Sequence, residues 1–184
     1  MARLRSAVYL DGRLCLLLAL LLLLLPLPWI LAAVLAAAVH ELCHGAAVLL
    51  LGGRIYSLSL SADGIGMEVS PLSPGREMLA ALAGPAGSGM LTLFAPFLPR
   101  TALCAVVHCL FNLLPLFPLD GGRFLQNLLI LCLPGYDAAA VFETVQRILR
   151  ILLVLCCLLA SARWGILPAA LGMLLLRRQK ARTV

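Results

Sequence analysis

Two histidines separated by three residues, in His40-Glu41-Leu42-Cys43-His44, stand inside an apolar stretch that runs from Trp29 to Leu51. On a helix this spacing places both imidazoles on one face, where they can bind one cation. Glu41 lies about 100° around the helix, close enough to act on a water molecule at that cation. The pattern is typical of zinc hydrolases, but two histidines leave the metal short of ligands.

Asp120 is the candidate for the third ligand. It ends an apolar run that is otherwise free of acids, from Asn112 to Leu119. A carboxylate in hydrocarbon needs a partner, and zinc explains this one best. Two histidines and one aspartate leave a fourth position for water, as in catalytic zinc sites. The residues therefore indicate hydrolysis with one Zn²⁺ per chain.

Glu41 is the candidate catalytic residue, because a carboxylate beside the metal can take a proton from water and deliver it to a leaving amine. The alternative is a structural ion pair. No basic residue lies between Arg13 and Arg54, so a catalytic base is the better interpretation.

Three segments resemble the site-2 protease family of intramembrane metalloproteases: His40 to His44, Asn112 to Gly122, and Ala83-Gly84-Pro85-Ala86 between them. The similarity covers roughly 28–124. The chain looks most like the short branch without an inserted domain, the stage IV sporulation protein FB group. The family often has Asn soon after its Gly-Pro pair, whereas this chain has Gly87-Ser88.

The resemblance implies regulated proteolysis of a membrane-embedded or membrane-adjacent protein segment, with zinc held by His40, His44 and Asp120. In the branch most like this chain, the implied substrate is a sporulation transcription-factor precursor. A membrane regulatory partner is a further expectation.

Composition indicates one domain, 1–184, of an all-α polytopic membrane protein. Of the 184 residues, 63% are hydrophobic and 12% are charged, which excludes an ordinary soluble globule. We predict about six transmembrane helices, with a catalytic core at about 28–124 and C-terminal helices at 138–177. A span needs roughly 20 residues, so several runs must borrow flanks such as Tyr9 to Arg13 or Ala138 to Arg147. The apolar runs are Leu14 to Leu25, Trp29 to Leu51, Met78 to Leu98, Ala102 to Leu119, Ile148 to Ala160 and Trp164 to Leu176.

The basic residues are distributed unevenly between these runs. Once the spans are drawn, only Arg100 and Arg163 fall on one side, and the other basic residues fall on the opposite side. The positive-inside rule then predicts a multi-pass protein of the cell membrane with both termini in the cytoplasm. The lipid bilayer accounts for the net charge of +6 without nucleic acid as a partner.

The chain before Asp120 is expected to leave helical geometry. Pro115 and Pro118 cannot donate backbone hydrogen bonds and disrupt a regular helix, so this segment should be unwound or kinked at the inner end of the fourth span. Gly121 and Gly122 then permit a close approach of the backbone. The next stretch, 124–133, is too short to span and is expected at the cytoplasmic interface.

A β-hairpin is predicted between the second and third spans. Tyr56, Leu58 and Leu60 alternate with serines, and Asp63-Gly64 can form the turn. Its apolar face could lie at the membrane boundary, and a strand edge near the metal could hold an unwound substrate by β-augmentation. The alternative is a hairpin that only connects two helices.

Three further side chains have two possible roles each. Asn112 could orient the substrate or support the oxyanion, or it could form an interhelical hydrogen bond. His108 is three turns from Asp120, too far for the same metal on a regular helix, and is expected to pack or hydrogen-bond. Cys43 is better explained as a packing side chain than as a metal ligand.

Two other classes of function compete with a protease. The His and Asp set could be a transient site in a metal transporter, although the chain shows no obvious internal repeat and no further acids or histidines that form a path. A non-catalytic membrane scaffold could also retain this fold. Replacing Glu41 with Gln separates the classes, because only hydrolysis requires that carboxylate.

Overall fold

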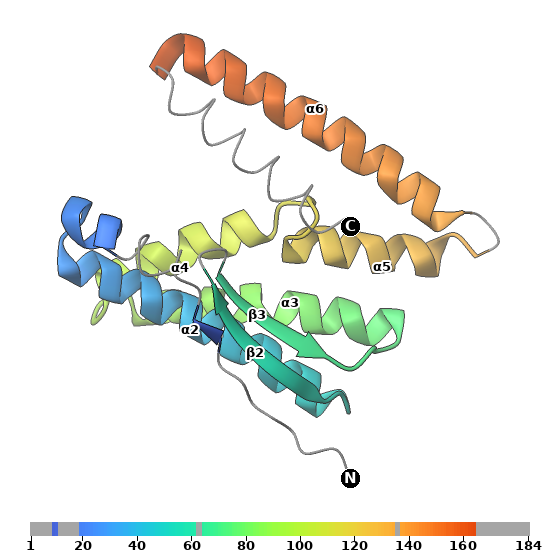
Figure 1. Cartoon of the computed structure of the whole chain (residues 1–184), viewed down its shortest axis with the longest axis horizontal. Helices are drawn as coiled ribbons and strands as arrows, with labels where there is room; N and C mark the ends of the chain where they lie inside the picture. Colours follow the sequence, from blue (N-terminus) through green and yellow to red (C-terminus); the bar gives the residue numbers. More distant parts are fainter. Residues whose placement is uncertain (1–8, 11–18, 62–63, 135–136, 165–184) are drawn as a thin grey trace.

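The computed structural model describes residues 9–10, 19–61, 64–134 and 137–164. The chain is mainly helical and carries a small sheet, as the sequence predicts (Figure 1). The elements in chain order are β1 Tyr9–Leu10, α2 Leu27–Leu50, β2 Ile55–Ser61, β3 Gly64–Val69, α3 Pro74–Leu91, the 3-10 helix η1 Thr92–Phe94, α4 Pro99–Asn112, α5 Asp120–Cys132 and α6 Ala138–Trp164.

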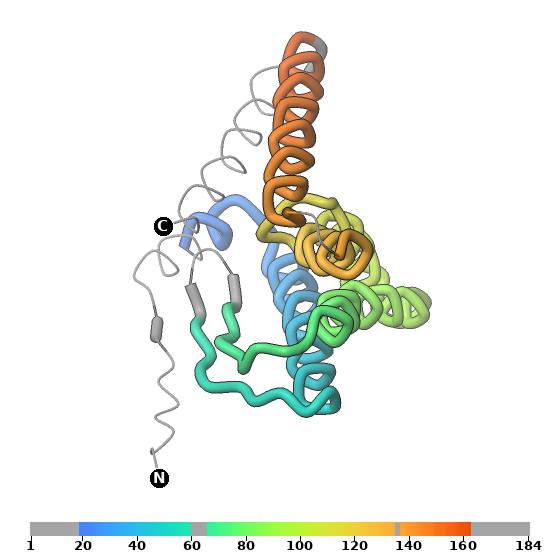
Figure 2. Tube along the Cα trace, turned by 90° about the vertical axis from the view of Figure 1, so that its right-hand side faces the viewer, coloured from blue at the N-terminus to red at the C-terminus, as the bar shows by residue number. Residues whose placement is uncertain are grey.

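Helix α3 is the centre of the helical group. It packs against α2, α4 and α5, whereas α6 contacts α5 and projects away from the other helices (Figures 1 and 2). The buried face of α3 is built from small residues, namely Ala80, Ala81, Gly84, Gly87 and Ser88, together with Pro85. Small side chains let helix backbones approach closely, so both α2 and α5 can pack against α3.

Helix α2 ends where the chain must turn toward the sheet. Gly52 has a φ of 82°, a left-handed conformation that glycine adopts without a steric cost. The N–H of Gly53 donates to the carbonyl of Val48 at 2.8 Å, which closes the last turn in the manner of a Schellman cap. The Arg76 guanidinium on α3 donates to the Leu51 carbonyl at 3.2 Å. The end of α2 is therefore tied to the start of α3.

The predicted hairpin is confirmed. Strands β2 and β3 are antiparallel, with Leu58 opposite Met67 and Leu60 opposite Ile65. The sheet also contains β1, which pairs parallel to β2, so the strand order is β1-β2-β3. Tyr9 and Leu10 are therefore in a strand, and the expectation that they extend the first helix was wrong. Backbone partners in the sheet fix these two residues in the extended state.

The hairpin has one apolar face, and part of it lies on α2. A methyl group placed on Gly45 would be 3.4 Å from the Met67 sulfur and 3.5 Å from Cδ1 of Ile55, which is ordinary to tight packing. On the other face, the Ser57 hydroxyl donates to the Glu68 carboxylate at 2.7 Å. The alternation of apolar and polar residues thus positions the sheet against α2 at Gly45, the residue after His44.

Two of the described helices, Leu27–Leu50 and Ala138–Ala162, are long and apolar enough to cross a membrane. The third and fourth apolar runs extend past the helices that contain them, because α3 ends at Leu91 and α4 at Asn112. Residues 19–24 of the first run are helical, and the last run lies outside the described residues apart from Trp164. The count of six spans stays a prediction.

The segment between α4 and α5 is non-helical, as the prolines predict. Asp120 does not end the fourth helix; it is the first residue of α5. The stretch 124–133, expected at the cytoplasmic interface, belongs to this helix up to Cys132, and its place at the interface stays a prediction. The chain therefore breaks before Asp120 because Pro115 and Pro118 interrupt the helix, and it resumes helical geometry at the aspartate itself.

Candidate metal centre

Three side chains that are far apart in sequence converge between α2 and α5. Nε2 of His40 and Nε2 of His44 are 3.1 Å apart, and Oδ2 of Asp120 lies 3.0 Å from the first and 3.1 Å from the second. The exposed fractions of the three residues are 1%, 7% and 7%. Within the described residues, these three form the group of His, Cys, Asp and Glu side chains that could hold a metal ion.

The arrangement fits a tetrahedral metal. Zinc binds nitrogen and oxygen ligands at about 2.0–2.2 Å, so ligand atoms on a tetrahedron lie roughly 3.3 Å apart, close to the observed 3.0–3.1 Å. Gly84 of α3 leaves room in front of the two nitrogens. A methyl group there would overlap the His44 imidazole and lie 2.7 Å from Nε2 of His40. The donor set and this open cradle both suit a cation.

Helix α3 holds the other nitrogen of each imidazole. Nδ1 of His40 is 2.9 Å from the Ser88 hydroxyl, and Nδ1 of His44 is 2.7 Å from the Ala80 carbonyl oxygen. A carbonyl can only accept, so Nδ1 of His44 carries the proton and its Nε2 presents a lone pair. Such partners fix the tautomer and the ring orientation of metal-binding histidines.

Asp120 is positioned by the close approach of two backbone segments. A methyl group on Gly121 would lie 2.6 Å from the Leu113 carbonyl carbon, and one on Gly122 would lie 2.6 Å from the Leu116 carbonyl oxygen. Both contacts are with backbone, which cannot move aside like a flexible side chain. The two glycines therefore allow the 113–119 loop to pack on the first turn of α5, as the sequence predicts.

Glu41 is half-buried on α2 between the two histidines. The ion pairs formed among the described residues do not include it. Arg123 of α5 pairs with Glu77 of α3, at 3.2 Å. The Glu41 carboxylate is therefore not used in a structural ion pair within this part of the chain.

A family model described as Peptidase M50B-like matches residues 13–164. The chain belongs to the M50B-like peptidase family. A search of curated proteins finds no match. Among solved structures, the site-2 protease from Methanocaldococcus jannaschii is similar, with a TM-score of 0.66 and 20% identity over 93% of this chain and 87% of that chain. The resemblance to site-2 proteases is thus confirmed for the fold, and the M50B-like family makes the chain a metalloendopeptidase.

The structure shows the contacts of the three side chains for which the sequence left two possible roles. His108 packs edge-to-face on His40, with ring centroids 4.5 Å apart, which agrees with the predicted packing role. Cys43 packs against Gly87 of α3, where a methyl group would overlap its sulfur, and it is not part of the metal-ligand group. The Asn112 amide donates to the His108 carbonyl at 3.0 Å, within its own helix, so this donor does not form the interhelical bond that was one of its two possible roles, and the role toward substrate stays a prediction.

The hairpin residues of the peptidase lie on β2, which pairs with β3 and, at Ser59 and Leu60, with β1. Tyr56 and Leu58 are 49% and 47% exposed. Because β2 lies between two strands in the described sheet, β3 offers the outer edge beside the hairpin. The predicted contacts at Tyr56 and Leu58 would therefore use side chains, and backbone pairing would use β3; the side chain of Leu60 lies outside the described part of the chain.

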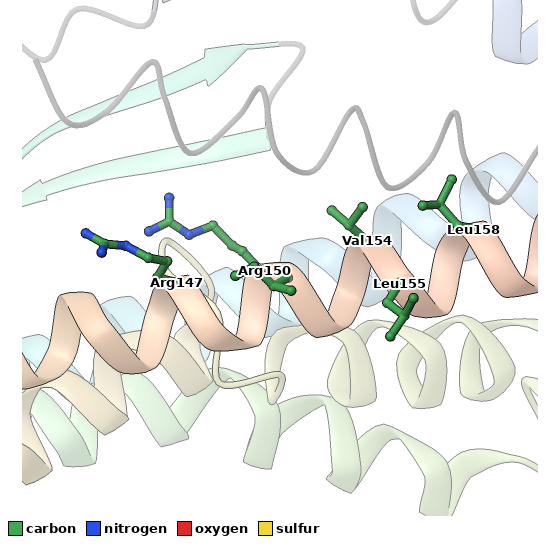
Figure 3. Close-up of a pocket in the computed structure, with 6 residues that line it drawn as sticks. Arg147, Arg150, Val154, Leu155 and Leu158 are labelled. Atoms are coloured by element: carbon green, nitrogen blue, oxygen red, sulfur yellow. The ribbon is translucent and has the colours of Figure 1, made fainter.

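Two of the surface cavities among the described residues lie on α6 and beside α4. One, of about 630 Å³, lies on α6 beside Arg147, Arg150 and Val154, and none of the metal ligands lines it (Figure 3). The other, of about 430 Å³, lies between α2 and α4. It is lined by apolar side chains together with His108, and it is the cavity that adjoins the metal centre: Trp29, Ala33, Leu103, Cys104, Val107, His108 and Phe111.

Sequence reasoning missed the partners that hold the metal ligands. Ser88 is the nearest signal, since it is a polar residue among the small residues of α3 and stands near the place where the family often has Asn. The Ala80 contact is made by a backbone carbonyl, so no side chain in the sequence indicates it. Gln146 of α6 stands among other polar residues, Glu143, Thr144 and Arg147, so nothing in the sequence distinguishes it.

Proposed function

We propose that this M50B-like peptidase is a zinc-dependent intramembrane endopeptidase that cleaves a membrane-embedded or membrane-adjacent segment of another protein. The observation that carries the proposal is the buried triangle of His40, His44 and Asp120, with ligand atoms 3.0–3.1 Å apart in front of Gly84. Three protein ligands with an open position are the mark of catalytic rather than structural zinc sites.

The chemistry divides between the metal and one carboxylate. A bound zinc ion acidifies water and polarises the scissile carbonyl. Glu41 accepts the proton of the attacking water and later delivers it to the leaving amine. His40 and His44 present Nε2 because Ser88 and Ala80 engage their other ring nitrogens. The contacts of the two histidines thus support their role as ligands.

A membrane helix must unwind locally before a peptidase can cut it, because its carbonyls are hydrogen-bonded within the helix. The outer edge of β3 can pair with an extended segment, and Tyr56, Leu58 and Leu60 can contact its side chains. Met67 and Ile55 pack at Gly45, the residue after His44, so the sheet stands beside the metal centre.

The substrate enters from the bilayer in this proposal. We place the chain in the cell membrane as a multi-pass protein with both termini in the cytoplasm, on the basis of its basic residues. The 1–184 domain has its catalytic core at about 28–124. A sporulation transcription-factor precursor and a membrane regulatory partner are what the resemblance to the sporulation branch suggests.

A comparison of membrane proteomes tests the proposal. Cells that carry the native chain are compared with cells that carry Glu41→Gln, which keeps the size of the side chain but removes the base. We expect a membrane-associated protein to accumulate uncleaved in the variant. Identical proteomes would contradict proteolysis, and metal transport that survives the substitution would favour the transporter instead.

A further inference from the structure

Helix α6 holds the segment that precedes Asp120 through one side chain. The Oε1 atom of Gln146 accepts the N–H of Phe117 at 3.0 Å, and its Nε2 atom donates to the Pro115 carbonyl at 2.9 Å. A single amide therefore pairs with a donor and an acceptor on the loop. Gln146 is only 5% exposed, and Phe142, one turn earlier, packs edge-to-face on Phe117 at 6.4 Å.

The loop needs an outside partner at this point. Pro115 and Pro118 have no N–H group, so Phe117 carries one of the few donors between them. Gln146 lies eight residues into α6, or about 12 Å along a helix that is apolar enough to span the membrane. A polar side chain at that depth is costly without partners, and the two loop groups supply them.

The same peptide is held from the side of α5. Gly122 packs on the Leu116–Phe117 peptide, where a methyl group would lie 2.6 Å from the Leu116 oxygen. Gln146 therefore holds the loop while Gly122, two residues after Asp120, allows it to rest on α5. Only two residues separate Phe117 from Asp120, which leaves little freedom for the aspartate to move independently of the loop.

We propose that Gln146 is a positioning residue for the metal centre: by fixing the Pro115 to Phe117 backbone it holds Asp120 Oδ2 against the two imidazoles, and so makes metal affinity depend on the docking of α6. The inference rests on the proposed function, since it takes Asp120 as a metal ligand. It does not depend on which substrate is cleaved.

Metal affinity tests this role in the purified full-length chain. Gln146→Leu removes both hydrogen bonds with little change in size, and we expect zinc affinity, measured by competition with a chromophoric chelator, to fall about 10- to 100-fold. The visible bands of bound Co²⁺ should also change, because they report the geometry of the ligand set. The matched control is Thr144→Val on α6, whose exposed hydroxyl bonds only to Ala140 of its own helix.

Two measurements keep the test decisive if Gln146→Leu fails to fold. Gln146→Glu keeps an acceptor for the Phe117 N–H but not the donor for Pro115, so its affinity should lie between those of the native chain and Gln146→Leu. In the native chain, the Phe117 amide should exchange slowly with solvent deuterium.

Native zinc affinity and an unchanged Co²⁺ spectrum in either folded variant would overturn the role of Gln146, as would rapid exchange at Phe117. Metal binding without any cleavage by the native chain would instead count against the proposed function and leave the positioning role intact.

Discussion

Both histidines of the metal centre are held through Nδ1, but by partners of different kinds. His40 meets the side chain of Ser88, and His44 meets the backbone of Ala80. Only the first partner can be removed by substitution. The contribution of this support to metal binding can therefore be measured at Ser88, without touching a metal ligand.

Ser88→Ala should weaken zinc binding by about 10- to 100-fold, because the His40 ring loses the partner that fixes its orientation. The measurement is competition with a chelator in the full-length protein. Ser161→Ala is the control, since its hydroxyl bonds to the Cys157 carbonyl within α6. Equal affinity of the Ser88 variant and the native chain would show that the contact does not position the ligand.

Gly84→Ala should abolish metal binding and lower the melting temperature, because the methyl group would overlap the His44 imidazole. Gly89→Ala lies in the same helix and meets nothing within 4 Å, so it should keep native metal binding. Thermal unfolding and metal content of both variants check the prediction. A Gly84 variant that still holds one metal per chain would contradict the proposed cradle.

At the scale of elements, α3 joins the two halves of the site. It supplies the partners of both histidines, and through Glu77 it pairs with Arg123 of α5. Asp120 begins the same helix that carries Arg123. The ion pair thus links the helix of the histidine partners to the helix of the aspartate.

The Glu77 and Arg123 pair should contribute little free energy. Its side chains are 19% and 38% exposed, and pairs open to solvent are typically worth about 0.2–1 kcal/mol. A double-mutant cycle with Glu77→Ala and Arg123→Ala, followed by unfolding, measures the coupling. A coupling well above this range, accompanied by loss of metal, would mean that the pair, rather than packing, sets the position of α5.

At the scale of the whole molecule, a metal that binds the folded chain but not the unfolded chain must stabilise the fold. We expect about 2.7 kcal/mol of added stability when free zinc is about 100 times its Kd, and loss of that gain with a chelator. Asp120→Asn should reduce the response, whereas Asp137→Asn, at an exposed helix start, should not. A melting temperature that stays the same with added zinc and with added chelator would contradict a metal centre that forms on folding.

The sequence was sufficient for the candidate histidine pair and for the hairpin, because both follow from local spacing. The four-residue spacing of His40 and His44 places them on one face of a helix, and the alternation of apolar and polar residues predicts the strands. The loop before Asp120 was also predictable from its prolines. Two features could not be predicted from the sequence: Asp120 is the first residue of α5, and β2 is the central strand. Both depend on where distant segments pack.

The partners of the site were hidden for the same reason. The backbone of Ala80 and the amide of Gln146 meet their targets only after α3 and α6 have docked. Every residue has a backbone carbonyl, so the residue type does not indicate which carbonyl orients an imidazole. Prediction from sequence therefore stopped at the metal ligands and did not reach the residues that hold them.

Cleavage by the purified chain is the most direct test of the central claim. The native peptidase and Glu41→Gln are reconstituted in vesicles with the membrane protein that accumulates in cells carrying the variant, and the metal content of each is measured. We predict one metal per chain in both, cleavage by the native chain, and a rate about 10²- to 10⁴-fold lower in the variant. Cleavage at the native rate by metal-loaded Glu41→Gln would contradict the assignment of Glu41 as the catalytic base.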